Sequence, residues 1–154
     1  MKISNLSGIE AVPLMYLIDT NVISEARKQS KANFGVRKFF EKASEEGAPM
    51  YLSAVTVGEL RRGVGLIQHR GDSRQADRLG QWLDKLLTDY GDQILDLDAD
   101  TAQVWGLLRV PHPENALDKQ IAATALIHGL ILVTRNEKHF AGIGVSVLNP
   151  FATG

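Results

Sequence analysis

Apolar residues along this chain gather in short segments that stop abruptly at polar side chains. The clearest segment, Leu14 to Ile18, is apolar at every position and ends at Asp19. It lacks the alternation of a strand with one wet face, so it predicts a strand covered on both sides, as in a parallel sheet. Further apolar segments at 50–52, 94–97, 131–134 and 145–148 predict four more strands.

Between these segments, apolar residues recur at the three- and four-residue steps of amphipathic helices. Gly47 and Pro49 close the first long helix, Gly129 stops the last, and Gly71 lies at the turn of a helical hairpin. The predicted helices cover 32–46, the segment after Ser53, 72–90, a segment capped by Asp98 or Asp100, and 116–128. This alternation predicts an α/β fold, a three-layer α/β/α sandwich with a mainly parallel sheet.

Asp19 stands where the first predicted strand ends. In open α/β sheets, ligands bind beyond the carboxyl ends of the strands, so this position favours a functional role. Asp19, Thr20 and Asn21 are also good N-cap residues for a helix through residues 22–24. The local pattern leaves capping and catalysis equally open.

Composition narrows the class of protein. The 154 residues, 44% of them hydrophobic, suit one domain with a substantial core. The chain has no cysteine, which excludes disulfides and thiolate chemistry and makes the cytoplasm the default location. No apolar run is long enough to span a membrane, and residues 1–14 do not have the pattern of a signal peptide. We expect residues 1–14 to be an N-terminal extension and 15–154 to form the domain.

Three acidic residues occupy comparable places in the predicted fold, and an amide joins them. Asp19 ends the first strand, Glu59 lies early in the helix after the second, Asp118 falls in the first turn of a later helix, and Asn136 follows the fourth strand. In a parallel sheet all four can converge at the carboxyl edge, where carboxylates repel each other unless a cation binds. Hard oxygen ligands suit Mg²⁺ or Mn²⁺, and Mg²⁺ sites often act on phosphate esters.

Basic residues concentrate on the predicted hairpin, although the net charge of −1 shows no global basic excess. This local positive surface could contact nucleic-acid phosphates, although a solvated helix face is the commoner explanation. Its members are Arg61, Arg62, His69, Arg70, Arg74 and Arg78. The remaining histidines, His112, His128 and His139, are scattered and form no metal-binding motif.

Four segments in order resemble the motifs of a known family. They are residues 17–25 (LIDTNVISE), 52–60 (LSAVTVGEL), 118–125 (DKQIAATA) and 133–136 (VTRN), followed by LNP at 148–150. Together they are similar to PIN-domain proteins, and among these to the VapC and FitB type, the toxin half of VapBC-like toxin–antitoxin pairs. The likeness extends from Met15 to Phe151.

This resemblance implies a function as well as a fold. It implies an α/β/α homodimer that cleaves RNA with Mg²⁺ or Mn²⁺, is inhibited by a VapB-like antitoxin, and meets DNA only through that antitoxin. Asp19 and Asp118 would hold the metal directly, Glu59 would bind it or orient water, and Asn136 would position water or ligand. Asn21 and Thr134 are expected to donate hydrogen bonds to Asp19. Asn136 departs from the family, which often has Asp there.

A second class of function stays open at this stage. A chain with the same fold could bind nucleic acid, alone or in complex with an antitoxin, without cutting it. Metal-dependent cleavage of RNA by the isolated chain separates this binding module from the nuclease.

Overall fold

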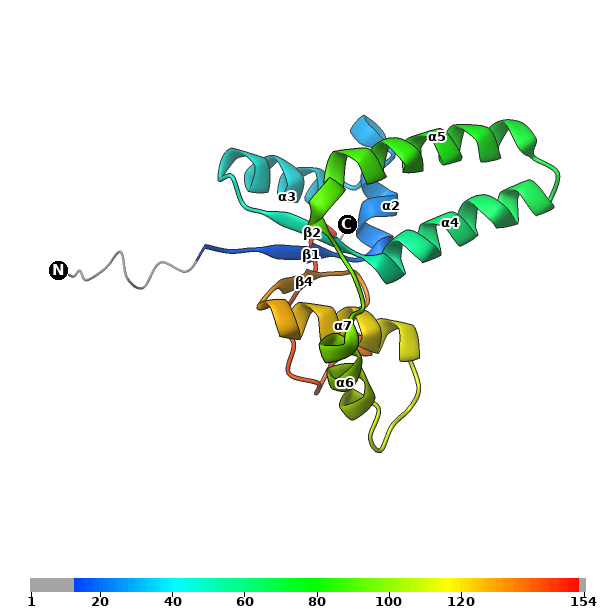
Figure 1. Cartoon of the computed structure of the whole chain (residues 1–154). Coiled ribbons are helices and arrows are strands. Elements are labelled where there is room, and N and C mark those ends of the chain that lie inside the picture. The colour runs from blue at the N-terminus through cyan, green and yellow to red at the C-terminus, as the bar shows by residue number, and fades with distance from the viewer. Residues whose placement is uncertain (1–12, 153–154) are drawn as a thin grey trace.

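Five parallel strands form the centre of the molecule in a computed structural model, which describes residues 13–152 (Figure 1). Their order across the sheet is β3-β2-β1-β4-β5, and each neighbouring pair is parallel. The strands are β1 (Tyr16–Ile18), β2 (Met50–Ser53), β3 (Ile94–Leu95), β4 (Ile131–Val133) and β5 (Val147–Leu148). The prediction of an α/β fold with a mainly parallel sheet is therefore confirmed.

Burial on both faces explains why β1 shows no alternation of apolar and polar residues. Tyr16 and Ile18 belong to the hydrophobic cluster on one face of the sheet, whereas Leu17 belongs to the cluster on the other. Both Leu17 and Ile18 are completely buried. Burying each such side chain contributes about 1.5–3 kcal/mol, so neither face tolerates a polar residue here.

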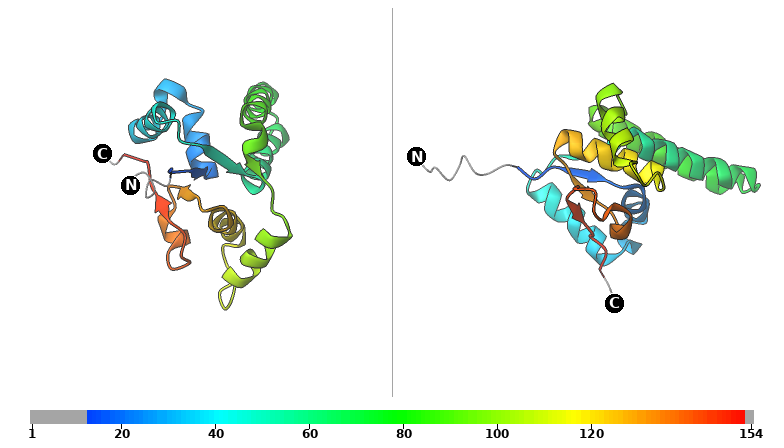
Figure 2. Two further views of the ribbon diagram at one scale, coloured as in Figure 1. Left: turned by 60° about the vertical axis from the view of Figure 1, so that its left-hand side comes forward. Right: turned by 90° about the horizontal axis from the view of Figure 1, so that it is seen from below.

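Helices cover the two faces unequally, as Figure 1 and the turned views of Figure 2 show. The first face carries α2 (Thr20–Ala26), α3 (Phe34–Glu45), α4 (Ala54–His69) and α5 (Ser73–Tyr90). The second face carries α7 (Ala116–His128), with α6 (Ala99–Leu108) packed beside it. Residues 13–152 also contain three short 3₁₀ segments: η1 (Gln29–Lys31), η2 (Gly91–Gln93) and η3 (Glu137–Phe140). The predicted three layers are present.

Side-chain caps start α2, α4 and α6 at positions that the sequence suggests. Asp19 caps α2 by accepting a hydrogen bond from the backbone N–H of Thr20, and Ser53 caps α4. Of the two candidates for α6, Asp98 is the cap, because its carboxylate accepts from the N–H of Thr101. At the other end of α7, Gly129 adopts φ +65°, which only glycine reaches readily.

Several predicted boundaries were wrong by a few residues. The third strand is limited to Ile94–Leu95 rather than 94–97, and the last to Val147–Leu148 rather than 145–148. The first helix after α2 begins at Phe34 rather than 32, because Asn33 caps it through hydrogen bonds from Gly35 and Val36. Edge strands extend only as far as their partner strand hydrogen-bonds them, and side-chain pattern does not reveal that limit.

The predicted hairpin across Gly71 is confirmed. Helices α4 and α5 run beside each other and project beyond the sheet (Figure 1), and Gly71 has φ +92°. Arg61 on α4 pairs with Asp84 on α5 at 2.8 Å. No helix within residues 13–152 is long and apolar enough to cross a membrane. Of the expected N-terminal extension, residues 1–12 lie outside the described residues.

Candidate functional site

A cavity of about 240 Å³ lies at the carboxyl edge of the sheet, where β1 and β4 end. All four residues predicted from the sequence line it, and they come from four separate segments of the chain. The lining residues are Asp19, Thr20, Asn21, Glu59, Leu117, Asp118, Ile121 and Asn136. The parallel topology therefore brings the predicted residues together, as a shared sheet edge requires.

Asp19 is the most tightly held residue of the cavity, with 3% of its surface exposed. Its Oδ1 accepts from the N–H of Thr20 at 2.8 Å, which is the helix cap. Its Oδ2 accepts from the hydroxyl of Thr134 at 2.7 Å and from the amide of Asn21 at 3.3 Å. The expected donations from Thr134 and Asn21 are thus both present. Helix capping and a functional role are therefore compatible for Asp19, because the same side chain caps α2 and lines the cavity.

The environment of Asp19 disfavours its negative charge. Burial raises the pKa of the Asp19 carboxyl above its ordinary value, the hydrogen bonds from Thr134 and Thr20 lower it, and the negative charge of Asp118 raises it further. The net result is a raised pKa. A cation bound in the cavity would reverse this effect, since opposite charge favours the carboxylate.

Asp118 lies in the first turn of α7, where the helix dipole favours a carboxylate. Its Oδ2 lies 2.7 Å from Nδ1 of His139, a residue of η3. His139, one of the scattered histidines of the sequence, was not predicted to belong to the site. His139 lies three residues after Asn136 in the sequence. That spacing indicates proximity to the site only once the fold is known.

Glu59 and Asn136 also line the cavity. Glu59 is half-buried on α4, the second helix turn after the Ser53 cap. Asn136 is exposed at the start of η3, and its N–H donates to the Thr134 hydroxyl at 3.0 Å. Asp118 is among the causes that raise the pKa of Asp19, whereas Glu59 is not. The negative charge of Asp118 therefore acts on the Asp19 carboxyl.

The donor set suits a hard divalent cation that keeps part of its water. All the donors are carboxylate or amide oxygens, the ligand type that Mg²⁺ prefers, and Mg²⁺ commonly takes one or two carboxylates with waters in the other positions. Within residues 13–152, no three His, Asp or Glu side chains are close enough together to form a metal cluster by themselves. The residues therefore fit a hydrated cation held by Asp19 and Asp118, rather than a fully protein-enclosed one.

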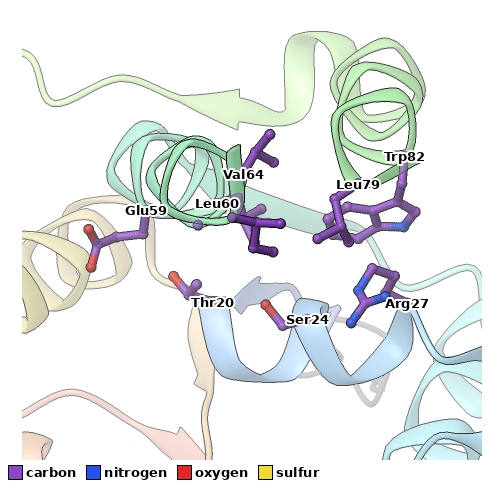
Figure 3. Close-up of a pocket in the computed structure, with 10 residues that line it drawn as sticks. Thr20, Ser24, Arg27, Glu59, Leu60, Val64, Leu79 and Trp82 are labelled. Atoms are coloured by element: carbon purple, nitrogen blue, oxygen red, sulfur yellow. The ribbon is translucent and has the colours of Figure 1, made fainter. Parts of the chain in front are cut away.

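A second hollow of about 180 Å³ joins the cavity, since Thr20 and Glu59 line both. It runs between α2, α4 and α5, and Figure 3 shows Glu59 at one end and Arg27 at the other, beside Leu79 and Trp82. Its middle is mainly apolar. Leu60, Val64 and Ile67 of α4 provide much of that apolar surface.

Comparison with known proteins places this geometry in a family. The PIN domain profile matches residues 16–145, a span that contains Asp19, Glu59, Asp118 and Asn136. The chain belongs to the PIN-domain family. It is 35% identical over 144 residues to toxin FitB of Neisseria gonorrhoeae (strain ATCC 700825 / FA 1090), covering 89% of this chain and 99% of that protein.

Two further relatives of this PIN-domain chain support the same grouping. A protein of Sinorhizobium fredii (strain NBRC 101917 / NGR234) called VapC ribonuclease Y4jK is 30% identical over 142 residues, which is 89% of this chain and 98% of the relative. The crystal structure of FitAcB from Neisseria gonorrhoeae superimposes with a TM-score of 0.75 at 33% identity, covering 88% of this chain and 98% of the other. The predicted resemblance to VapC- and FitB-type PIN domains is confirmed.

The basic residues of the PIN domain's hairpin do not line the carboxylate cavity. Four arginines are exposed along α4, α5 and the turn between them: Arg62, Arg70, Arg74 and Arg78. Arg61 forms an ion pair with Asp84. Arg62 lies three residues after Glu59 and therefore on the same side of α4. The exposed arginines thus give the hairpin a positively charged surface that extends away from the edge of the cavity.

Proposed function

We propose that this protein is a toxin-type endoribonuclease that depends on Mg²⁺ or Mn²⁺ and is restrained by a VapB-like antitoxin. The observation that carries the proposal is the convergence of Asp19, Glu59, Asp118 and Asn136 on one cavity. The names of the relatives, a VapC ribonuclease and a toxin, agree with this chemistry. A site of hard oxygen donors at a sheet edge suits the hydrolysis of a phosphodiester.

Each side chain has a role that its surroundings support. Asp19 and Asp118 would hold the cation, because the negative charge of Asp118 helps to raise the pKa of the Asp19 carboxyl and a cation would offset that repulsion. When bound, the cation supplies Lewis-acid chemistry and offsets the negative charge of the phosphate. Glu59 would orient the attacking water and accept its proton, and Asn136 would position water or a phosphate oxygen through its amide.

The amide of Asn136 affects how many metal ions we expect the site to bind. An amide oxygen carries no full charge, so it attracts a second cation less strongly than a carboxylate would. We therefore propose a single-metal site in which Asn136 contributes hydrogen bonds.

The test is RNA cleavage by the purified chain with Mg²⁺, Mn²⁺ or EDTA, beside Asp118→Asn under the same conditions. We expect cleavage that requires the metal and disappears in the variant, while circular dichroism of the variant stays that of the folded protein. RNA binding without any cleavage by the wild-type chain would overturn the nuclease and favour the non-cleaving binding module.

The hollow beside the cavity supports the proposed partner. Its ends carry opposite charges, Glu59 next to the cavity and Arg27 at the far end, with apolar surface between them. A peptide segment with a basic residue near Glu59, an apolar residue in the middle and an acidic residue near Arg27 would complement this order. Such a segment would bring a positive charge to the carboxylates and compete with the cation.

Growth assays test the partner. Expression of the chain alone should arrest growth, and co-expression with the adjacent small reading frame should relieve the arrest and yield a co-purifying complex. Arg27→Glu should weaken that complex without reducing RNA cleavage by the free chain. Growth that continues under expression of the folded chain alone would contradict the toxin proposal.

The proposed homodimer has a suitable apolar surface at the α6–α7 hairpin. Leu107 is 75% exposed, Val110 74% and Leu117 48%, and Trp105 fastens the two helices by donating to the carbonyl of Ala116. Because Leu117 also lines the cavity, a second copy docked here would lie next to the site. Light scattering of the wild type and of Leu107→Ser should show a dimer that weakens in the variant.

A further inference from the structure

His139 contacts the carboxylate that the proposed function makes a metal ligand. Its Nδ1 lies 2.7 Å from Oδ2 of Asp118, a distance typical of a strong hydrogen bond. Among the described residues, no other side chain hydrogen-bonds the Asp118 carboxylate. The contact joins η3 to the first turn of α7, 21 residues apart in the sequence.

The segment that carries His139 is anchored on both sides. Phe140, the next residue, is 2% exposed and packs in the cluster with Ile121 and Ala122 of α7. The N–H of His139 donates to the carbonyl of Asn136 at 3.0 Å, which closes the turn. Although the imidazole itself is 47% exposed, its backbone is therefore held against α7.

The same segment also holds the other proposed ligand. Thr134 donates to Oδ2 of Asp19, and the N–H of Arg135 donates to the amide oxygen of Asn21, which in turn donates to Asp19. Residues 134–139 thus contact Asp19 at one end and Asp118 at the other. A single segment sets the relative placement of the two carboxylates.

We propose that His139 is a positioning residue for Asp118. Its Nδ1–H donates to Oδ2, which fixes the rotamer of Asp118 and leaves Oδ1 for the cation. This inference rests on the proposed function, because it assigns His139 a role toward the metal that Asp118 would hold. Hydrogen bonds to the ligands of a metal orient them and tune their affinity, and an exposed ion pair without such a role would contribute little.

The geometry of the contact allows a sharp test. In His139→Asn the amide nitrogen occupies nearly the place of Nδ1, whereas in His139→Gln it reaches nearly the place of Nε2. The measurement that tests the proposal is Mn²⁺ binding to the full chain by titration calorimetry. His139→Ala should lower the affinity by about tenfold or more, His139→Asn should restore it to within a few-fold, and His139→Gln should not.

Controls separate this role from general stability. His69→Ala removes an exposed histidine at the end of α4, outside the cavity, and should leave Mn²⁺ affinity unchanged. Metal-free thermal unfolding should be similar for all the variants. RNA cleavage by His139→Ala should recover at saturating Mn²⁺, because the loss lies in binding.

The outcomes distinguish failure of the inference from failure of the proposed function. If the wild type binds Mn²⁺ and His139→Ala binds it equally well, or if the Asn and Gln variants behave alike, His139 does not position Asp118. If the wild type binds no Mn²⁺, or if Asp118→Asn binds it as well as the wild type does, the metal site itself is wrong and the inference falls with it.

Discussion

Two carboxylates that line the same cavity, Asp19 and Asp118, are held in different ways. Asp19, at the end of β1, is 3% exposed and accepts three hydrogen bonds, from Thr20, Asn21 and Thr134. Asp118, in the first turn of α7, keeps 24% of its side chain exposed, and within residues 13–152 its carboxylate has a hydrogen bond to one side chain, His139. One carboxylate is fixed by its surroundings, and the other depends on one contact.

This difference has an energetic consequence. Burial fixes Asp19 but raises its pKa, so the metal-free protein holds its negative charge at a cost in stability. Asp118 is close to solvent and avoids much of that cost, but its position is less completely determined. Asp19 therefore provides the rigid half of the site, whereas the placement of the Asp118 carboxylate depends on His139.

The largest expected effect comes from removing either charge. Asp19→Asn and Asp118→Asn should each reduce metal-dependent RNA cleavage by more than about a hundredfold, since loss of a direct ligand should exceed the effect of losing a residue that only orients one. Cleavage kinetics and circular dichroism measure this together. A folded variant with wild-type activity would remove that carboxylate from the site.

The next effect tests the rigid half alone. Thr134→Val removes the donor to Asp19 and the acceptor for the N–H of Asn136, whereas Thr134→Ser keeps the hydroxyl. The Val variant should lose about 10- to 100-fold in Mn²⁺ affinity and about 1–3 kcal/mol in stability, because a buried carboxylate loses a partner. The Ser variant should stay close to the wild type. Equal behaviour of the two would mean that the hydroxyl does not hold Asp19.

A smaller effect is expected where the segment 134–139 meets the cavity. Asn136→Asp adds a negative charge with little change of shape, so it should tighten Mg²⁺ binding and reduce the stability of the metal-free form. Asn136→Ala should reduce cleavage modestly. A magnesium titration of cleavage rate and of melting temperature compares the three proteins. Superimposable curves for the three proteins would mean that Asn136 has no role in the site.

The smallest effect is the pH dependence that follows from the raised pKa of Asp19. Because the folded state binds this proton more tightly than the unfolded state, its contribution to the stability of the metal-free protein is lost as pH rises through the raised pKa. The melting temperature of Asp19→Asn relative to the wild type should therefore increase as pH rises above about 4. Saturating Mn²⁺ should reverse the trend, and a difference that is constant with pH in the metal-free proteins would contradict it.

Much of the site follows from local pattern. The continuous apolar run before Asp19 indicates a strand buried on both faces, and the polar residues at strand ends converge as soon as the sheet is parallel. The placement of Glu59 and Asp118 at this edge follows in the same way, because each lies in the early turns of a helix that begins near the sheet edge. Local pattern does not determine where the edge strands β3 and β5 end, because that depends on the pairing of backbone groups across strands.

The sequence by itself determined the alternation of strands and helices, the caps at Asp19 and Ser53, and the set of carboxylates, since these depend on residue type and short spacing. Only the tertiary structure decided that His139 meets Asp118. That contact requires η3 to dock on α7 through the burial of Phe140, and it joins residues that share no local period. The packing likewise decided that Asp19 is buried and Asp118 is not, because exposure depends on which segments close over each residue.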